Sequence, residues 1–575
     1  MVKRKREAPK TEAVAASTKK QKSTVPARTT TTTDKAHTPA ASTPASTTAS
    51  IPTTAADPNA RETIQVVVGT YDGILHGLVA SIEPPKPRAK KEKKKSKSKT
   101  SKKDEVTGTE GDGEEGRDDE KEDVSFADTF LFHAHTKAMR SVAVSPPSAP
   151  LPRQPQKVLL ASGDNSGRIN SYVLAAHPPS ARPRDALLAA VTPRPILESK
   201  GNRELGTFDH HSGAVTALAF PSRSKMLSAS DDSTIAVMRT RDWALLEPIK
   251  VPAAKAYGRP SGDTAPLGGT PSGVNDLAVH PSMRLMISVS KGERSMRLWN
   301  LVTGKKAGVL NFDRALLQEA GEGRHATGEG RRVVWGSVGG EDQFAVAFER
   351  DAAVFGMDSV PRCRLAPPTL RTKLHQMEFL ELSRDDDDDD SAGTTTTTTT
   401  TLLAVSTEDG RVLFFSTADD DIRPPAEGQT YGTARLVASL GGRSAGVASR
   451  IKDFAVLRSA ARPGTLLLAG GCSDGKVHLW RVTESELVAA AESKRMNESK
   501  SKGKETETGT EKDGAVAENN VGSLVGVYDT GNRITCLAAF VMIPRPEDVE
   551  EEDEEEDEEE EPSDDDDDDG SEDSD

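Results

Sequence analysis

The stretch GVNDLAVHPSMRLMISVSKGERSMRLWNLVTGKKAGVLN, residues 273–311, decides the fold. It contains four short runs of apolar and β-branched residues, each too short to form a helix. The runs cover Val274–His280, Leu285–Val289, Ser295–Leu301 and Ala307–Asn311. Pro, Gly and polar residues that favour turns separate them. The stretch therefore predicts a four-stranded antiparallel meander.

The meander should occur in several copies, because a sheet of this size cannot bury both of its faces alone. The same pattern recurs along the chain, each time with a tight turn between the second and third strands. These turns are at residues 72–73, 164–167, 231–233, 291–293, 350–351, 408–410 and 473–475. The repeat predicts an all-β fold, a seven-bladed β-propeller.

The first hairpin, Ile64–Thr70 with Ile74–Ile82, has no first strand before it. Near the other end of the chain, residues 533–540 (RITCLAAF) resemble Ala214–Phe220 (AVTALAF), and no second strand follows them. We expect this C-terminal strand to close the first blade by pairing with Ile64–Thr70. Closure of this kind removes an open sheet edge that would favour aggregation.

Composition divides the chain into a propeller and segments without a core. Residues 1–60, rich in Thr, Ala, Ser, Pro and Lys, are expected to be a disordered basic tail. The propeller is expected to cover residues 61–543, and residues 544–575 to be a disordered acidic tail. Disordered insertions are expected at residues 84–123, 176–202, 383–401 and 483–520.

The formal net charge of −15 hides a strong asymmetry along the chain. Residues 547–575 contain 23 acidic residues and no basic ones, so the rest of the chain carries +8. A basic body with an acidic tail suits a protein that works among polyanions and basic proteins. The tail could bind ribosomal proteins or histones, or could simply keep the protein soluble.

Two basic clusters lie in the N-terminal tail with the spacing of a bipartite nuclear-import signal. The candidate residues are Lys3, Arg4, Lys5, Arg6, Lys19, Lys20 and Lys22. A merely solvated charged tail is the alternative interpretation. These clusters and the Lys-rich stretch 86–103 could also contact RNA phosphate nonspecifically. They lack the interleaved aromatic residues that sequence-specific binding would use.

Several classes of protein are disfavoured by the sequence. The three cysteines, Cys363, Cys472 and Cys536, form no CxxC pair and indicate neither a disulfide framework nor a zinc site. No apolar run approaches the length needed to cross a bilayer. Residues 470–476 match the GxxxxGK phosphate-loop pattern but join two expected strands, and Val477 replaces the required Ser or Thr.

No catalytic constellation is apparent either. His375 and His478 are single histidines on expected strands, without a second ligand at metal spacing. Neither a Ser-His-Asp arrangement nor a pair of carboxylates stands out. We therefore expect a protein that is not an enzyme, has no cofactor or metal, and binds neither membranes nor a small-molecule substrate.

The repeat resembles the WD repeat, in which a His between blades, a Ser or Thr on the second strand, the turn Asp and a third-strand Trp form a buried hydrogen-bond network. Such polar residues are expected to be structural, because buried polar groups need partners. Tyr172 and Met238 stand at two of the Trp positions. The network residues expected here are His135, Ser162, Asp164, His211, Ser230, Asp232, Trp299, Asp409, Asp474 and Trp480.

Connections between strands alternate between the two faces of a propeller, which allows the insertions to be sorted. Most of them fall in first-to-second or third-to-fourth connections and so share one face. Only residues 252–272 and 314–330 fall on the other face, which carries the tight turns. We name this the turn face, and expect it to be the main binding surface because it is less obstructed.

Longer stretches resemble the PAK-interacting-protein family, the maintenance-of-killer type of WD-repeat protein. They are VVGTYD at residues 67–72, LGTFDHHSGAVTALAF at residues 205–220, and VNDLAVHPSMRLMISVSK with RLWNLVTGKKAGVLNF within residues 274–312. The resemblance covers roughly residues 63–482. It does not extend to the basic and acidic insertion at residues 84–123, the Asp and Thr runs at 385–401, or the acidic tail.

The resemblance implies a nuclear and nucleolar protein. Its first implied function is that of a non-enzymatic scaffold in assembly of the large (60S) ribosomal subunit, binding pre-ribosomal particle proteins or ribosomal proteins. Its second is negative regulation of a p21-activated kinase through direct binding. A histone chaperone built from a propeller and an acidic tail is a third, weaker alternative.

Overall fold

The computed structural model describes nine stretches of the 575-residue chain. They are residues 61–83, 124–151, 154–179, 202–252, 273–322, 326–368, 372–384, 398–502 and 519–544. Contacts divide the chain into Met1–Thr54 and Ala55–Asp575. The first unit lies outside the described residues, and all that follows concerns the second.

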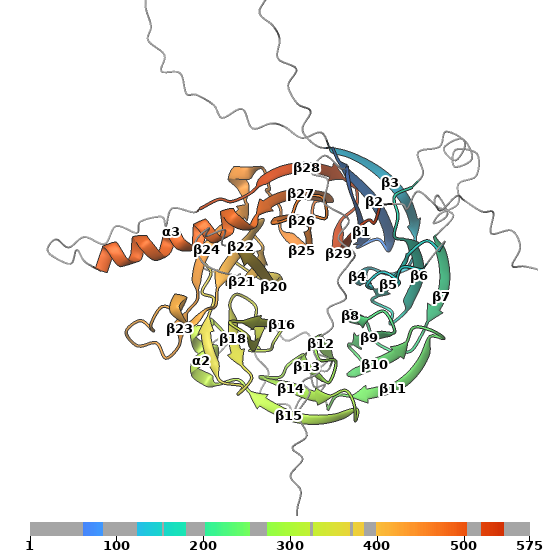
Figure 1. Cartoon of the computed structure of the whole chain (residues 1–575). Coiled ribbons are helices and arrows are strands. Elements are labelled where there is room, and N and C mark those ends of the chain that lie inside the picture. The colour runs from blue at the N-terminus through green and yellow to red at the C-terminus, as the bar shows by residue number, and fades with distance from the viewer. Residues whose placement is uncertain are drawn as a thin grey trace, which may run out of the picture. The chain divides into compact units, whose positions relative to one another are not determined.

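The described residues form seven sheets arranged as a ring of blades (Figure 1). This confirms the predicted seven-bladed β-propeller. From the innermost strand outward, blade 1 contains β29 (Ile534–Val541), β1 (Glu62–Thr70), β2 (Ile74–Ile82) and β3 (Val124–His133). Blade 2 contains β4 (Met139–Val144), β5 (Lys157–Asp164), β6 (Ile169–Ala175) and β7 (Arg203–Phe208). Blade 3 contains β8 (Val215–Ser222), β9 (Lys225–Ser230), β10 (Thr234–Arg239) and β11 (Ala244–Lys250).

Blades 4 to 7 continue the ring. In the same order, blade 4 contains β12 (Val274–Val279), β13 (Leu285–Ser290), β14 (Ser295–Asn300) and β15 (Lys305–Asn311), and blade 5 contains β16 (Arg332–Val338), β17 (Glu341–Ala347), β18 (Ala352–Gly356) and β19 (Pro361–Arg364). Blade 6 contains β20 (Leu374–Arg384), β21 (Thr398–Thr407), β22 (Arg411–Ser416) and β24 (Arg435–Gly441). Blade 7 contains β25 (Ile451–Arg458), β26 (Thr465–Cys472), β27 (Lys476–Thr483) and β28 (Ser523–Asp529). A two-residue strand, β23 (Gly432–Thr433), pairs in parallel with β19 and adds a fifth strand to blade 5.

Blade 1 is built from both ends of the folded chain. Strand β29 pairs with β1 in antiparallel register from Ile64 opposite Val541 to Thr70 opposite Ile534. The backbone N–H of Tyr71 donates to the Arg533 carbonyl oxygen at 2.9 Å, so pairing continues beyond the last residues of the ladder. Every residue of β1 is buried. The ring therefore has no open edge at the position where the chain enters and leaves it.

The hydrophobic core is divided into clusters, and several of them are shared by neighbouring blades. One contains Phe344, Phe348 and Phe355 of blade 5 together with Ile287 and Val289 of blade 4. Another joins Val66 and Val68 of blade 1 to Leu467 and Leu479 of blade 7. Burial of such side chains contributes about 1.5–3 kcal/mol each. Each blade is consequently stabilised by its neighbours, as a stacked repeat requires.

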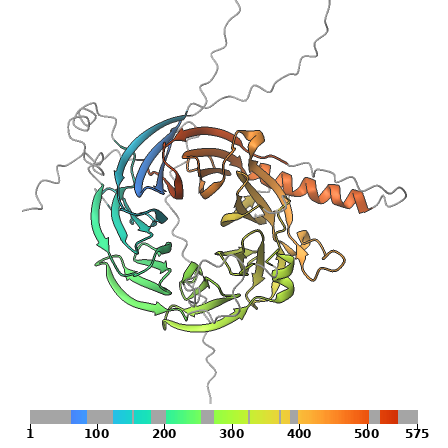
Figure 2. The same cartoon turned by 180° about the vertical axis from the view of Figure 1, so that it is seen from behind.

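The insertion at residues 483–520, expected to be disordered, begins with a long helix, α3 (Glu484–Lys502). Its start is a capping box: the Glu486 N–H donates to Thr483 Oγ1 at 3.2 Å, and the Thr483 N–H donates to Glu486 Oε2 at 3.1 Å. Leu487, Ala490 and Ala491 are buried against blades 6 and 7. The expectation of disorder is therefore wrong for residues 484–502. Figure 2 shows α3 extending outward from the ring.

Two other insertions also contain more ordered structure than expected. Within the segment 383–401, β20 continues to Arg384 and β21 begins at Thr398, so the last Thr residues of the run form a strand. Within 176–202, Ala176 and His177 are buried, and the Ala176 carbonyl oxygen accepts from the Ile543 N–H at 2.8 Å.

A short helix, α2 (Arg314–Glu319), buries Leu316 and Leu317 between blades 4 and 5. The insertion expected at 84–123 lies outside the described residues.

Candidate protein-binding face

The most complete polar network of the expected kind lies in blade 3. His211 Nε2 lies 2.8 Å from Ser228 Oγ, and His211 Nδ1 lies 2.9 Å from Thr234 Oγ1. Thr234 Oγ1 donates in turn to Asp232 Oδ1 at 2.6 Å. The arrangement fits a neutral imidazole that accepts from Ser228 and donates to Thr234. It ties the connection before β8 to the turn between β9 and β10.

Ser230 does not occupy the position in this network that the sequence suggested. Its hydroxyl donates to the Gly213 carbonyl oxygen at 2.9 Å, and Ser228 is the partner of His211. The pairing register between the second and third strands explains this difference. The third-strand residue at the Trp position pairs with a residue of the second strand, and the network hydroxyl lies two residues after that paired residue. Met238 occupies that position in blade 3 and pairs with Met226, which places Ser228 in the network.

Blade 2 contains a related but looser network. His135 Nε2 lies 2.8 Å from Ser162 Oγ, whereas its Nδ1 lies 3.4 Å from Asp164 Oδ2. Asp164 also accepts from the N–H groups of Ser166 and Arg168 at 2.9 and 3.0 Å. These residues thus hold the turn between β5 and β6 in place.

The remaining expected network residues are separate fragments. In blade 4, Trp299 Nε1 donates to Ser288 Oγ at 2.8 Å. In blade 7, Trp480 stacks on His478 with ring centroids 5.3 Å apart, and Gly470 stands at the position of the network hydroxyl. Asp409 accepts from Thr407, and Asp474 from the Lys476 N–H at 3.3 Å, and both cap their own turns.

Burial lowers the pKa of His211, although the neighbouring Asp232 acts in the opposite direction. The unfolded chain therefore binds more protons than the folded chain below the ordinary His pKa of about 6.5. The stability that His211 contributes is present above that pH and decreases as the pH falls. We predict that the loss of unfolding free energy caused by His211→Gln is about 1 kcal/mol smaller at pH 5.5 than at pH 7.5.

Urea unfolding of both proteins at the two pH values measures this difference. Trp299→Phe is the matched control, because it removes a buried hydrogen bond of the same type without removing a titratable group. The Trp299→Phe loss should be the same at both pH values. An equal His211→Gln loss at both values would contradict the neutral imidazole.

A Ser-His-Asp chain that the sequence did not reveal is present on the opposite face. His280 Nδ1 lies 2.8 Å from Ser282 Oγ, and His280 Nε2 lies 3.0 Å from Asp342 Oδ2. The Ser282 N–H also donates to the same Nδ1 at 3.1 Å, so this nitrogen is shared between two donors. His280 packs edge-on against Trp335. The chain joins the turn after β12 to β17, and this double use of Nδ1 favours a structural role.

The two faces of the ring differ in how much chain covers them. Helix α3 and the segment between β22 and β24 both lie in third-to-fourth-strand connections, and Asp421 links them. Asp421 accepts from Arg435 Nη1 at 2.7 Å, from Arg495 Nε at 2.6 Å and from Ser416 Oγ at 2.6 Å. These contacts stabilise a layer on the face away from the tight turns. Within the described residues, the turn face thus carries less additional structure.

At the turn face, the inner strands begin with β-bulges. In six of the seven blades, one or two residues near the start of the inner strand have no partner in the second strand; β16 pairs regularly. A bulge redirects a side chain and is common next to functional sites. The bulged residues are Thr535, Arg140, Thr216, Asn275, His375 with Gln376, and Lys452.

Some bulged residues connect neighbouring blades. Thr216 Oγ1 donates to the Val274 carbonyl oxygen at 2.6 Å, and Asn275 Nδ2 donates to the Gly330 carbonyl oxygen at 2.8 Å. In blade 5, which has no bulge here, Arg332 Nε donates to the His375 carbonyl oxygen at 3.2 Å. These bonds fix the spacing between the inner strands at the turn face.

From blade 5 around to blade 1, the starts of the inner strands carry positive charge. We name this group the basic cluster; it consists of Arg332, Lys373, Arg450, Lys452 and Arg533, together with His375, which lies among them and is neutral. Three acidic side chains neutralise part of it. Lys373 lies 2.8 Å from Glu349, Arg450 lies 3.3 Å from Glu408, and Arg332 lies 3.7 Å from Asp276.

The members of the basic cluster act on one another electrostatically. Burial lowers the pKa of His375 to about 3, with further lowering by the charges of Lys452 and Arg450. Burial likewise lowers the pKa of Lys452 to about 8, helped by Arg450 and Arg533. The half-buried Lys452 is thus surrounded mainly by charges of its own sign.

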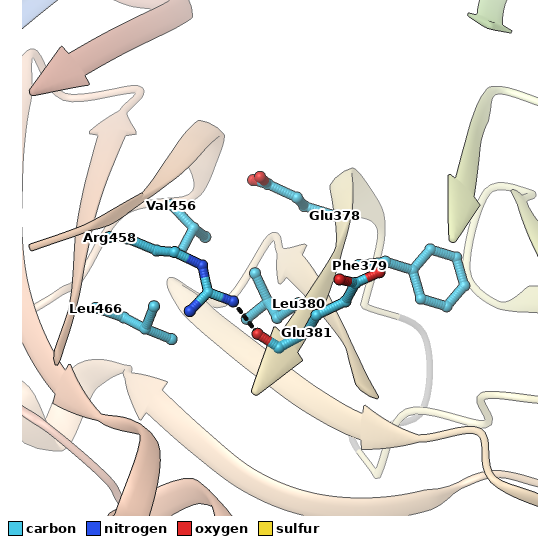
Figure 3. A pocket seen from close by; sticks show the side chains of 7 residues that line it. All are labelled: Glu378, Phe379, Leu380, Glu381, Val456, Arg458 and Leu466. Carbon is cyan, nitrogen blue, oxygen red and sulfur yellow. Dashed lines mark hydrogen bonds between the residues drawn. The ribbon is translucent and has the colours of Figure 1, made fainter. Parts of the chain in front are cut away.

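A small cleft lies near the opposite ends of β20 and β25 (Figure 3). Glu378, Glu381 and Arg458 contribute its charged groups, and burial raises the pKa of Glu378 to about 7. In Figure 3 the Glu378 carboxylate lies apart from the Arg458 guanidinium, which donates to the Glu381 carbonyl oxygen. Arg458 also binds Glu484 Oε1 at 2.5 Å. Arg458 thus links the lining of the cleft to the first residue of α3.

Other sequence predictions are placed as follows. The GxxxxGK match at residues 470–476 joins strands β26 and β27, so no helix follows it. Cys363, Cys472 and Cys536 are buried free thiols, and burial raises the pKa of each to about 12. The import-signal candidates, the Lys-rich stretch at 86–103 and the acidic tail lie outside the described residues.

Neither described helix is long and apolar enough to cross a bilayer. Across the described ranges, no three His, Cys, Asp or Glu side chains gather as a metal site would require.

Seven four-stranded blades and these His, Ser and Asp networks define a WD-repeat β-propeller. The family model for the WD domain, G-beta repeat, matches residues 202–237, which contain β7 to β9 and most of β10. Protein MAK11 of Saccharomyces cerevisiae is 26% identical over 386 residues, which cover 63% of this chain and 72% of that protein.

Two vertebrate relatives carry the name p21-activated protein kinase-interacting protein 1-like. The Danio rerio protein is 23% identical over 238 residues, 41% of this chain and 45% of that protein. The Xenopus laevis protein is 29% identical over 117 residues, 20% of this chain and 27% of that protein. The matches thus span less than half of each vertebrate relative. The chain is thus a WD-repeat β-propeller that is similar in sequence to MAK11 and to the two p21-activated protein kinase-interacting protein 1-like proteins.

Proposed function

We propose that this protein is a non-enzymatic scaffold in assembly of the large (60S) ribosomal subunit, located in the nucleus and nucleolus. The observation that carries the proposal is the match to MAK11 over 72% of that protein, because the maintenance-of-killer resemblance implies this process. A closed ring of seven sheets supports a binding role, since it holds loops from different blades in fixed positions. Pre-ribosomal particle proteins or ribosomal proteins are the proposed partners.

The turn face is the proposed docking surface. It carries the basic cluster and, in blade 2, the exposed Lys137 and Arg140. The opposite face is occupied in part by α3 and by the segment around Asp421. Cationic side chains on a rigid surface favour partners with acidic or phosphorylated segments and accelerate their association. The Lys-rich segments would add nonspecific contacts to RNA.

Sedimentation tests this proposal. Tagged full-length protein from cell lysate should comigrate on sucrose gradients with precursor RNA of the large subunit at low and at moderate salt. Lys137→Glu with Arg140→Glu should weaken the comigration, whereas Lys225→Glu on the opposite face should leave it unchanged. Comigration lost at moderate salt in the unaltered protein would leave only nonspecific electrostatic attachment. Absence from precursor fractions at both salt concentrations would reject the assembly role.

Binding to a p21-activated kinase is the second candidate function, favoured by the names of the two vertebrate relatives. In that case the protein would bind the kinase's regulatory segment and block activation. Pull-down with the purified kinase distinguishes the candidates, because a scaffold of ribosome assembly need not bind it. A histone chaperone is the weakest candidate, and it would require core-histone binding that disappears when residues 547–575 are deleted.

A further inference from the structure

The basic cluster contains two polar groups whose hydrogen-bonding capacity is unused within the described residues. His375 Nε2 is buried and has no hydrogen-bond partner there. The half-buried Lys452 ammonium forms neither a hydrogen bond nor an ion pair with any residue of the described ranges. Buried polar groups in folded proteins are nearly always paired, so the unpaired His375 Nε2 is an exception, and it lies in the same cluster as the unpaired ammonium of Lys452.

The positions of these groups are set by the backbone. His375 and Lys452 are bulged residues at the starts of β20 and β25, the inner strands of adjacent blades. Figure 1 shows that β20, β25 and β29 lie on the inner side of their blades, toward the centre of the ring. Similar bulges occur at the start of the inner strand in six of the seven blades. The positions of these two side chains therefore follow from a repeated feature of the propeller, not from the conformation of a single loop.

The charges around Lys452 require an anionic partner. The pKa of its ammonium is lowered by the charges of three cations, Arg450, Arg533 and Lys373, and raised by one acid, Glu408. Glu408 already binds Arg450 at 3.3 Å, and Glu349 already binds Lys373 at 2.8 Å. Within the described residues, two cations therefore have no acidic partner: Lys452, and Arg533, whose guanidinium lies over the Tyr71 ring at 5.5 Å. An added carboxylate would relieve the repulsion among them.

A protein segment fits this site better than a nucleic acid does. The unused groups are recessed among inner strands, where a narrow extended chain can place one carboxylate at a time. Single-stranded nucleic acids are held mainly by stacking on open aromatic rings. The Tyr71 ring at this site is covered by Arg533 on one face. The ammonium of Lys452 can donate charge-assisted hydrogen bonds to such a carboxylate.

We propose that the basic cluster is a docking site for an acidic, Asp- and Glu-rich peptide segment of a partner protein, with carboxylates bound by Lys452 and Arg533. The proposal rests on the proposed function, in that it identifies the chemistry of the partner at the turn face. It predicts that the scaffold selects partners by acidic segments presented in an extended form.

Fluorescence anisotropy of a fluorescein-labelled oligoglutamate peptide, titrated with the full-length protein, tests the proposal. Lys452→Gln should weaken binding by about tenfold or more, the effect typical of losing one charge-assisted bond in a recessed site. The matched control is Lys225→Gln, the same change at an exposed lysine on the opposite face, and it should change binding by less than about twofold. Both variants should retain the circular dichroism spectrum of the unaltered protein.

The acidic tail of the chain itself could compete with the added peptide, so a second measurement uses the same full-length protein. Carbodiimide joins an amine to a carboxylate that contacts it, and mass spectrometry then identifies the partner of Lys452. A cross-link from Lys452 to residues 547–575 would support the acidic-peptide chemistry of the site, but it would overturn the assignment of the site to a partner protein. Absence of both oligoglutamate binding and the cross-link would overturn the proposal.

Two further outcomes separate the alternatives. If labelled oligouridylate bound in a Lys452-dependent manner and oligoglutamate did not, the site would be a nucleic-acid site and the proposal would be wrong. If Lys452→Gln abolished oligoglutamate binding while the unaltered protein failed to comigrate with large-subunit precursors, the docking chemistry would stand and the ribosomal function would fail. If the variant kept full comigration and oligoglutamate never bound, only the acidic-peptide inference would fail.

Discussion

Deletion of residues 534–575, which removes β29 and everything after it, is expected to abolish the cooperative unfolding transition of the propeller. Strand β29 belongs to two hydrophobic clusters at once. Ile534 and Leu537 pack with Leu467 and Leu479 of blade 7, and Cys536 packs with residues of blade 2. The Leu537 N–H also donates to the buried Asp453 at 2.9 Å. Without β29, both interfaces of blade 1 open and β1 becomes a free edge that favours aggregation.

The matched control is deletion of residues 546–575, which removes the acidic residues but keeps β29 and the hydrogen bond from Ile543 to Ala176. This shorter protein should unfold cooperatively near the temperature of the full-length protein. Differential scanning calorimetry and size-exclusion chromatography of both deletions measure the contrast. A folded monomer lacking β29 would show that closure through β1 is dispensable.

Asp421→Ala is expected to destabilise the protein by about 3–5 kcal/mol, the usual loss when one partner of a buried ion pair is removed. Asp421 is 1% exposed and binds the guanidinium groups of Arg435 and Arg495. Burial alone would raise its pKa, but the hydrogen bonds from Arg495 and Ser416 lower it overall. The substitution leaves the mostly buried Arg435 guanidinium without this counterion. It also releases α3, which carries Arg495.

Urea unfolding measures the loss, and hydrogen exchange measured by mass spectrometry locates it. Faster exchange should appear in residues 484–496 and around β24 before it appears in the other blades. Asp420→Ala is the control, because Asp420 is the exposed neighbour of Asp421 in the same turn. It should alter stability by less than about 0.5 kcal/mol. Equal effects of the two substitutions would show that the buried ion cluster does not hold α3.

Much of the fold could be predicted because the turns between second and third strands are short and polar. Each turn fixes two neighbouring strands, and seven such turns leave few architectures for a chain of this length. Blade 5 gave the weakest signal, with Arg350-Asp351 as its turn and a fourth strand of four residues. Its edge is completed by β23 from the blade 6 insertion, a contact between distant segments that no local pattern indicates.

The start of helix α3 has a local sequence pattern that predicts a helix, although the composition of the whole insertion suggests disorder. Glu484–Lys502 lies at the start of a Lys-, Glu- and Ser-rich insertion, which by itself suggests disorder. Thr483 and Glu486, however, form the T-x-x-E capping box, and strong helix formers follow. These local features, together with Leu487, predict at least the first turns. Arg495 adds a tertiary contact to Asp421 that the sequence could not reveal.

The candidate site was the least predictable part. The sequence predicts Ser230 as the network hydroxyl, whereas the strand register selects Ser228. His375 and Lys452 are placed by β-bulges, which arise from the pairing between strands. A bulged residue does not change the pattern of apolar and polar residues enough to be predicted from the sequence. The basic cluster therefore became visible only when four inner strands were brought side by side.

Closure of blade 1 also has a consequence for how the protein is synthesised. The Thr535 hydroxyl donates to the Gly69 carbonyl oxygen, 466 residues earlier in the chain. At about 5–20 residues per second, a ribosome needs roughly half a minute to a minute and a half to make the chain between them. Throughout that time β1 and β2 have left the ribosome without their inner strand. We therefore expect the nascent chain to need a chaperone that covers blade 1 until β29 has been synthesised.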